Sequence, residues 1–418
     1  MAAPAFSGRL WRHPDFMKLW AAQSISAFGA RITREGLPLA AVLTLDASPA
    51  QLGVLAALSM GPGMLVGLLA GGFVDRTSRR AILIGTDLLR FGVLMTVPIA
   101  AWLHLLGMEQ LYVVAALVGA ATVLFDLADR AFLPSLIDKD DLMEGNTKLS
   151  VTQSTAEIGG PALAGLLFQW LTAPFAIAVD AVTYLVSALF LRGVKAREEP
   201  PEKPAEAQHW AADLAFGWRT VMTEPRVRPL LFLFATQMMC FAFFGSLYAL
   251  FALKTVGLTP AALGVTIAIG GVGALLGAVL APRITRVLGV GPAIIVCGAV
   301  AAVSFFLIPL APADPVMGML FLMASQLVGD AFGVAAMIPT TTLQQTLIAP
   351  DALGRVGAIF QIARGAGWIV GALLCGVLAA AIGVRETLAI ACAGLLLLAE
   401  LIPAVSPLWR LRTLGEGP

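Results

Sequence analysis

The feature that most constrains this chain is a succession of apolar runs, most of them longer than a soluble helix needs. A helix of about 20 apolar residues crosses the hydrocarbon core of a bilayer. Of the 418 residues, 59% are hydrophobic and 13% are charged, against about 45–50% and about 25% in an ordinary soluble domain. A soluble surface displaying so much apolar side chain would aggregate. The sequence therefore predicts an all-α membrane protein and excludes a soluble enzyme, a disordered chain and a secreted disulfide scaffold.

Glycine, proline and charged residues divide the apolar sequence into twelve runs, six on either side of a polar stretch. The runs are continuous and lack the period-two alternation expected of the strands of a membrane barrel. We therefore expect twelve transmembrane helices, at 16–43, 51–74, 81–104, 110–133, 147–171, 174–194, 229–253, 260–281, 287–310, 316–338, 356–381 and 385–405.

The basic residues are distributed asymmetrically about these runs. With the N-terminus in the cytoplasm, 21 Lys and Arg residues lie in inner loops and helix ends, and two, Lys254 and Arg385, lie in outer loops. Loops rich in Lys and Arg face the cytoplasm. An even number of crossings also returns the chain to the side on which it began. We therefore expect a multi-pass protein of the inner (plasma) membrane with both termini cytoplasmic.

The second half of the chain repeats the first at an offset of 211 residues. The segment 48–54 (SPAQLGV) aligns with 259–265 (TPAALGV). Pro98, Gly160 and Gly165 likewise align with Pro309, Gly371 and Gly376. Two parallel six-helix repeats form one known transporter architecture, in which the substrate site lies between the halves. We expect six-helix bundles at 1–194 and 229–418, and a cytoplasmic linker at 195–228 with an amphipathic interfacial helix at 207–222.

The loop after the second run, Gly71-Gly72-Phe73-Val74-Asp75-Arg76-Thr77-Ser78-Arg79-Arg80, resembles the signature G-x-x-x-D-R-x-G-R-R of the major facilitator superfamily (MFS), with Ser78 in place of a glycine. The resemblance implies the MFS fold and a conformational gate. In that gate Asp75 faces the positive N-terminus of the eleventh span, near Arg355. The residues that we assign to the gate and its surroundings are Gly71, Asp75, Arg76, Arg79, Arg80, Asp87, Arg90, Arg355 and Arg364. For Asp87 and Arg90, a structural charge network beside the gate is the favoured interpretation.

The fifth run contains Gly159-Gly160-Pro161-Ala162-Leu163-Ala164-Gly165, which resembles the G-P-x-x-G-G core of the motif found in antiporters of the superfamily. Gly160, Pro161 and Gly165 match the motif, and plain helix packing is the alternative. The segment 131–136 (AFLPSL) and others in the first half resemble the branch of macrolide-efflux proteins and the enterobactin exporter. This resemblance implies proton-coupled export of small amphipathic molecules, drug-like or siderophore-like.

Charged residues inside the runs are costly at bilayer depth and are therefore candidates for function. Glu35 and Glu157 are candidate proton carriers, and Arg31 or Arg34 could stabilise a carboxylate or hold an anionic substrate group. The alternative is an ion pair between Arg31 and Glu35, four residues apart, with Arg34 reaching the headgroups. Further candidates for the substrate cavity, each with structural packing as its alternative, are Asp126, Gln153, Asp180 and Tyr248. We expect Asp126 to lie at the inner end of the fourth span.

Two other patterns predict packing surfaces. Gly63, Gly67 and Gly71, like Gly273 and Gly277, recur every fourth residue and are expected to pack the two halves against each other. The aromatic and methionine residues at 238–248 could line an apolar pocket or pack in the core. Asp330 and Arg364 could face the inner vestibule or form a cross-helix pair.

The net charge of +1 gives no reason to expect a nucleic-acid partner, and the sequence lacks a glycine-rich ATP loop. We expect a monomeric transporter, not an enzyme, with no cofactor and no metal. Its partners would be a small-molecule substrate, protons and the bilayer. Uptake of an organic anion, a lipid or lysolipid flippase and a non-transporting sensor are the competing interpretations.

Overall fold

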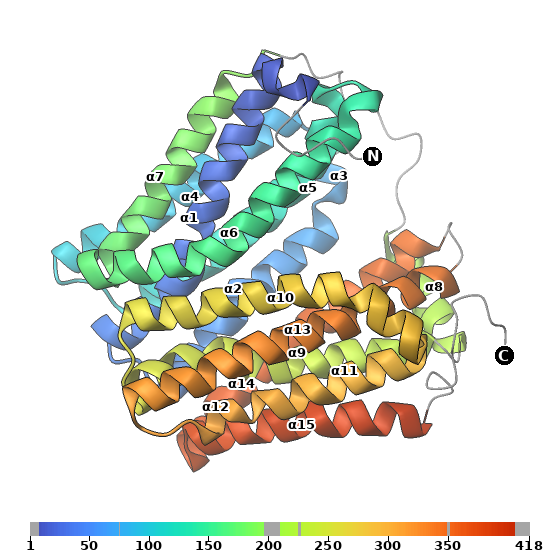
Figure 1. Ribbon diagram of the computed structural model, residues 1–418. Helices are drawn as coiled ribbons and strands as arrows, with labels where there is room; N and C mark the ends of the chain where they lie inside the picture. The colour runs from blue at the N-terminus through green and yellow to red at the C-terminus, as the bar shows by residue number, and fades with distance from the viewer. Residues whose placement is uncertain (1–7, 75, 196–209, 225–226, 349–351, 406–418) are drawn as a thin grey trace. The chain divides into compact units, whose positions relative to one another are not determined.

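Residues 8–74, 76–195, 210–224, 227–348 and 352–405 are described by a computed structural model, and within them every regular element is helical (Figure 1). Nine of the described helices are long and apolar enough to cross a membrane. Three further long helices, α1 (Pro14–Thr44), α6 (Leu142–Leu171) and α15 (Val384–Val405), coincide with the other three expected runs. The protein is therefore an all-α membrane protein, and the total of twelve crossings stays a prediction consistent with these helices.

The helices group into two compact units, one of residues 1–47 and 58–208 and the other of residues 48–57 and 209–418. Helix α2 (Pro49–Leu69) thus contributes its first turns to the second unit and the rest to the first. The other elements of the first unit are η1 (Arg9–Arg12), α1, α3 (Gly71–Val74), α4 (Arg79–Trp102), α5 (Met108–Leu136), η2 (Lys139–Asp141), α6 and α7 (Ala173–Arg192).

The second unit begins with α8 (Trp210–Thr223), a short helix inside the stretch expected to be amphipathic. Helix α9 (Val227–Leu250) continues into a π-helical turn, η3 (Phe251–Val256). The remaining helices are α10 (Pro260–Leu288), α11 (Val290–Phe305), α12 (Leu307–Leu310), α13 (Pro315–Leu347), α14 (Leu353–Ile382) and α15. Several of these extend beyond the expected runs, most clearly α13, because a helix need not end where its apolar sequence ends.

The offset of 211 residues found in the sequence recurs in the helix bounds. If 211 is added to the first and last residue numbers of α6, the result is the first and last residues of α14. The same offset relates Pro49, the first residue of α2, to Pro260, the first residue of α10. The residues that follow α6 and α14 correspond too: Thr172 has φ 63° and Gly383 has φ 102°. The two copies therefore share not only apolar content but also the places where the chain turns.

The glycine stripes pack helices within each unit. A Cβ built on Gly63 would lie 2.9 Å from the carbonyl oxygen of Gly119 in α5. A Cβ on Gly277 would lie 2.0 Å from the carbonyl oxygen of Ala331 in α13. Gly63 and Gly277 therefore pack against neighbouring helices of their own unit, and packing of one half on the other stays a prediction. Such small residues allow close backbone approach between neighbours of the same bundle.

Candidate functional site

A cross-helix ion pair joins α1 and α6 in the first unit. The Arg31 guanidinium lies 2.8 Å from the Glu157 carboxylate, and the Arg31 side chain is 11% exposed, whereas the Glu157 side chain is 55% exposed. Trp20 Nε1 donates a hydrogen bond to Thr152 Oγ1 at 3.0 Å and links the same two helices elsewhere along their length. The two helices are therefore held together by specific polar contacts as well as by apolar packing.

Gly160 explains how Arg31 reaches α6. A Cβ at this position would lie 2.6 Å from Cγ and 2.7 Å from Cβ of Arg31, so a larger residue would displace the arginine. Gly160 belongs to the antiporter-like segment, in which Pro161 and Gly165 are also buried. In this structure the glycine of that segment makes the recess in which the aliphatic part of Arg31 lies.

The ion pairs at the end of α1 differ from the expected one. Arg31 contacts Glu157 across the helices, and Glu35 lies 3.7 Å from Arg34, its neighbour in sequence. The expectation of an i,i+4 pair between Arg31 and Glu35 is therefore wrong. The reason is that the recess at Gly160 turns the Arg31 side chain toward α6 rather than along its own helix.

A second charged pair is completely buried in the first unit. Arg90 lies 2.6 Å from Asp87, and their side chains are 4% and 0% exposed. The Arg90 guanidinium lies between two rings, 4.5 Å from the centroid of Phe125 and 4.1 Å from that of Tyr184. Cation–π contacts of this kind add to the pairing where water is excluded. The pair and the two rings form a buried charge network across α4, α5 and α7, and its expected role beside the gate stays a prediction.

The signature loop anchors the start of α4 to its neighbours. Arg79 Nη1 donates a hydrogen bond to the carbonyl oxygen of Ala131 at 3.1 Å, and Arg80 Nε donates one to that of Leu191 at 3.0 Å. Carbonyls near a helix C-terminus carry partial negative charge and attract cations. Gly71 begins α3 and Arg76 is exposed. Asp75, to which we assigned the gate contact, lies outside the described residues.

The two gate arginines of α14 contact residues of their own unit. Arg355 lies 3.8 Å from Asp213 and stacks 3.9 Å from the Phe216 ring centroid, so it binds α8. Arg364 lies 5.4 Å from the ring centroid of Phe234 in α9. Among the described residues no ion pair joins Arg364 to Asp330. The expected contact of Asp75 with the start of α14 stays a prediction, because Asp75 lies outside the described residues.

The other candidates are dispersed through the structure. Asp180 is fully buried and accepts a hydrogen bond from Thr183 Oγ1 at 3.1 Å, an environment typical of packing. Gln153 is exposed and Tyr248 is partly buried. Asp126 is exposed in α5, which continues to Leu136, and its expected place at the inner end of the fourth span stays a prediction.

One polar contact escaped the sequence analysis. Gln23 in α1 donates a hydrogen bond from its amide to Asp129 in α5. A glutamine within an apolar run was the signal that could have identified it. No group of three or more His, Cys, Asp or Glu side chains in the described part of the chain could hold a metal ion.

Comparisons with known proteins place this geometry in a family. The family model of the Major Facilitator Superfamily matches residues 19–372. The MFS-type transporter YfiS of Bacillus subtilis (strain 168) is 26% identical over 405 residues, which cover 93% of this chain and 92% of YfiS. The MFS-type transporter y4rN of Sinorhizobium fredii is 25% identical over 376 residues, covering 87% of this chain and 88% of y4rN.

Solved structures show the same fold at low sequence identity. The nucleoside transporter NupG has a TM-score of 0.74 at 14% identity, covering 94% of this chain and 98% of NupG. A bacterial homologue of the iron transporter ferroportin, in an inward-facing state, has a TM-score of 0.77 at 16% identity, covering 96% of this chain and all of that chain. With its helices, its charged pairs and its signature loop, this chain belongs to the major facilitator superfamily and is a membrane transporter rather than an enzyme.

Proposed function

We propose that this transporter exports small amphipathic molecules in exchange for protons, and that Glu157 is the carboxylate that carries the proton. The observation that carries the proposal is the uneven exposure of the Arg31–Glu157 pair. The arginine is nearly buried in the recess at Gly160, whereas more than half of the glutamate side chain is exposed.

The exposure of a charge in a membrane helix supports a link to water. A carboxylate that faced acyl chains would cost several kcal/mol, and ionisable groups in spans therefore face the bundle interior or a water-filled cavity. Glu157 lies in α6 between the apolar segments 162–168 and the polar start of the helix. An aqueous route to Glu157 would let protons and a polar part of a substrate reach the same group.

The ion pair suggests how exchange could work. Arg31 is paired with the Glu157 carboxylate, and the same carboxylate can attract a cationic or hydrogen-bonding substrate group. Protonation removes the charge to which Arg31 is bound and leaves the cluster of Arg31, Arg34, Glu35 and Glu157 with one more positive charge. That change weakens the hold on a cationic substrate, so the proton and the substrate compete for one site.

The direction of transport rests on sequence resemblance. The antiporter-like segment contributes Gly160, and the first half resembles the branch of macrolide-efflux proteins and the enterobactin exporter. That both termini are cytoplasmic and that the protein is a monomer are likewise predictions from the sequence. One observation favours a second candidate, uptake of an organic anion: the Arg34 side chain is 65% exposed and could bind a carboxylate.

Purified protein in liposomes with an imposed pH gradient tests the proposal. The probes are ethidium, erythromycin and a catecholate chelator, each followed for accumulation against the gradient. We expect Glu157→Gln to abolish gradient-driven flux, because no proton can be exchanged at this position. Counterflow of cationic ethidium should weaken as well, because the substitution also removes the carboxylate that attracts it. Glu35→Gln is the matched control, since this carboxylate is 19% exposed and contacts Arg34.

Two outcomes would contradict this assignment. If Glu157→Gln kept full gradient-driven flux and Glu35→Gln lost it, the proton carrier would be Glu35 rather than Glu157. Accumulation of the catecholate chelator, or of a carboxylate added as a further probe, in the opposite direction, lost in Arg34→Gln, would establish the uptake of anions instead.

A further inference from the structure

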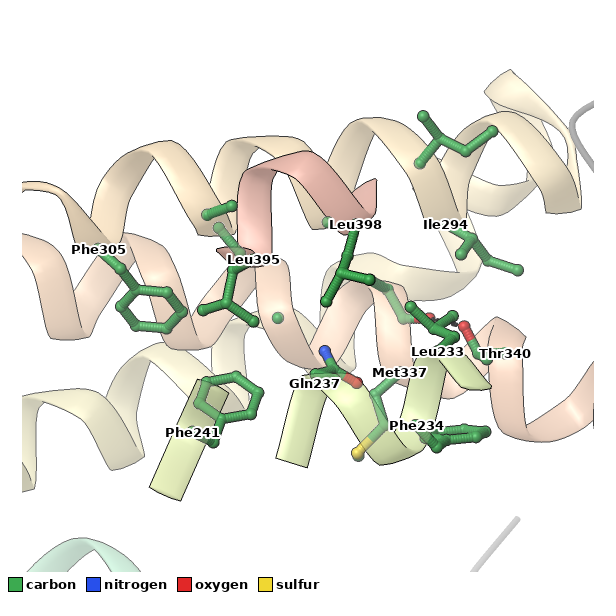
Figure 2. A pocket seen from close by; sticks show the side chains of 16 residues that line it. Leu233, Phe234, Gln237, Phe241, Ile294, Phe305, Met337, Thr340, Leu395 and Leu398 are labelled. Carbon is green, nitrogen blue, oxygen red and sulfur yellow. Dashed lines mark hydrogen bonds between the residues drawn. The ribbon is translucent and has the colours of Figure 1, made fainter. Parts of the chain in front are cut away.

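The second unit contains a cavity that has no role in the proposed exchange site. It lies between α9, α11, α13 and α15 and has a volume of about 80 Å³. Its walls are almost entirely apolar, as Figure 2 shows, and include Phe241, Phe305, Met337, Leu395 and Leu398. The rings of Phe241 and Phe305 meet edge to face, with centroids 5.8 Å apart, and form one end of the cavity.

The duplicated sequence explains why this space is open. Shifted by 211 residues, the buried pair Asp87–Arg90 of the first unit corresponds to Gly298 and Ala301, both of which line the cavity. Tyr184, which covers one face of Arg90, corresponds to Leu395. The second copy therefore has smaller side chains and no ion pair at the same four-helix position, and these smaller residues leave the volume unfilled.

Gln237 is the one amide in the cavity wall. Figure 2 shows its side chain extending from α9 into the space near Leu398 and Met337. Among the described residues its amide has no hydrogen-bond partner. The nearest other polar group in the wall, the Thr340 hydroxyl, already donates to the carbonyl oxygen of Ala336 at 2.7 Å. Gln237 is partly buried and its amide lies in the cavity wall, so a bound molecule that formed a hydrogen bond with it would be stabilised.

We propose that this cavity binds small neutral lipophilic molecules that carry a hydroxyl or carbonyl group, with Gln237 hydrogen-bonded to that group. The apolar wall excludes a charged ligand, because its desolvation would be uncompensated. The end of a lipid acyl chain would fill the space and leave the amide unpaired. An apolar protein cavity of about 150 Å³ binds benzene, so about 80 Å³ suits a short alkanol.

Photolabelling of the full-length protein in phosphatidylcholine nanodiscs tests this site. The probe is a diazirine derivative of butanol, and a diazirine derivative of butane without the hydroxyl is its comparison. We expect saturable labelling by the alkanol of residues on α9, α11, α13 and α15 that line the cavity. Excess 1-butanol should suppress this labelling, and peptide mass spectrometry reads the result.

Two substitutions test the two parts of the proposal separately: one fills the cavity, and the other removes the hydrogen bond. Gly333 lines the cavity, and a Cβ built on it meets no atom within 4 Å, so Gly333→Val should fill the space and abolish saturable labelling by both probes. Gly92→Val in α4 is the matched control, because a Cβ there also meets no atom within 4 Å and lies outside the cavity. Gln237→Leu should weaken labelling by the alkanol about fivefold, the equivalent of one hydrogen bond, and leave labelling by the alkane unchanged.

Several results would overturn the proposal. Labelling that does not saturate and spreads over exposed apolar residues in every variant would mean that the probe reports bulk lipid. Equal labelling by the alkanol in Gln237→Leu would remove the role of the amide. The melting temperature of each variant is measured alongside, and Ala301→Leu replaces Gly333→Val if the latter does not fold.

Discussion

The contact of α1 with α6 and that of α9 with α14 are copies of one another, and they have been filled in different ways. Gly160 of α6 faces the side chain of Arg31, whereas its counterpart Gly371 faces the backbone of α9: a Cβ on Gly371 would lie 2.1 Å from the carbonyl oxygen of Met239. At the position of Glu157 the second copy has Trp368. Both copies have the glycine. In the first copy it lies against the charged side chain of Arg31, and in the second it allows the backbones of α9 and α14 to approach closely.

The same contrast appears in the bundle interiors. The first unit keeps a buried ion pair between Asp87 and Arg90, and the second has an apolar cavity in the corresponding place. The two copies thus share helix positions, but only the first has buried polar chemistry at this place. Substitutions at these corresponding positions test how far each difference matters for stability.

The strongest test removes one charge of the buried pair. Asp87→Ala leaves Arg90 charged and buried, and we expect a loss of about 3–5 kcal/mol in the free energy of unfolding. The double variant Asp87→Gly with Arg90→Ala copies the second unit at these positions and should lose less, because no unpaired charge remains. Thermal melting of the purified protein in detergent measures both. A single variant that melts at the wild-type temperature would show that the pair contributes little.

The second test compares the corresponding glycines. Gly371→Ala forces Cβ against a backbone carbonyl that cannot move alone, and we expect it to cost about 1–3 kcal/mol. Gly160→Ala should cost less, and Arg31→Ala should partly restore stability in that background because it removes the contact at Cγ. The same melting measurement gives the coupling between Arg31 and each glycine. Equal coupling of Arg31 to both would refute the assignment of the recess to Gly160.

The smallest effect concerns a turn. Thr172, with φ 63° and ψ 160°, has the backbone conformation that suits glycine, and its counterpart Gly383 supplies one. We expect Thr172→Gly to stabilise the protein by about 1 kcal/mol and Gly383→Thr to destabilise it by a similar amount. A calorimetric scan of the two variants checks the sign. Destabilisation by Thr172→Gly would mean that the threonine side chain stabilises the turn by more than the strain costs.

Most of the fold could be predicted from the sequence because membrane spans are determined by local composition. Every expected run coincides with a long helix, and the offset of 211 residues reappears in the helix bounds. The start of α6 and the end of α13 were predicted less well, since these helices continue past their apolar segments. Hydropathy indicates where a chain enters the bilayer better than where its hydrogen bonding stops.

The partners of the charged residues could not be predicted in the same way. The sequence identified Arg31, Glu35 and Glu157 as unusual, yet the pairing depends on a recess at Gly160 on another helix. The cavity was missed for a related reason: it results from small residues on four helices rather than from a motif. Aligning Arg90 with Ala301 and Tyr184 with Leu395 would have indicated it, because the loss of bulk in one copy is visible at the known offset.

The two polar ties between α1 and α6, from Trp20 to Thr152 and from Arg31 to Glu157, have a practical consequence for measuring motion. The hydrogen bond from Trp20 to Thr152 does not depend on the protonation of Glu157. A spin label on each helix near this bond should therefore keep one separation while other distances vary with the transport cycle. The distance between these two labels would then be the constant reference with which the displacement of every other segment is compared.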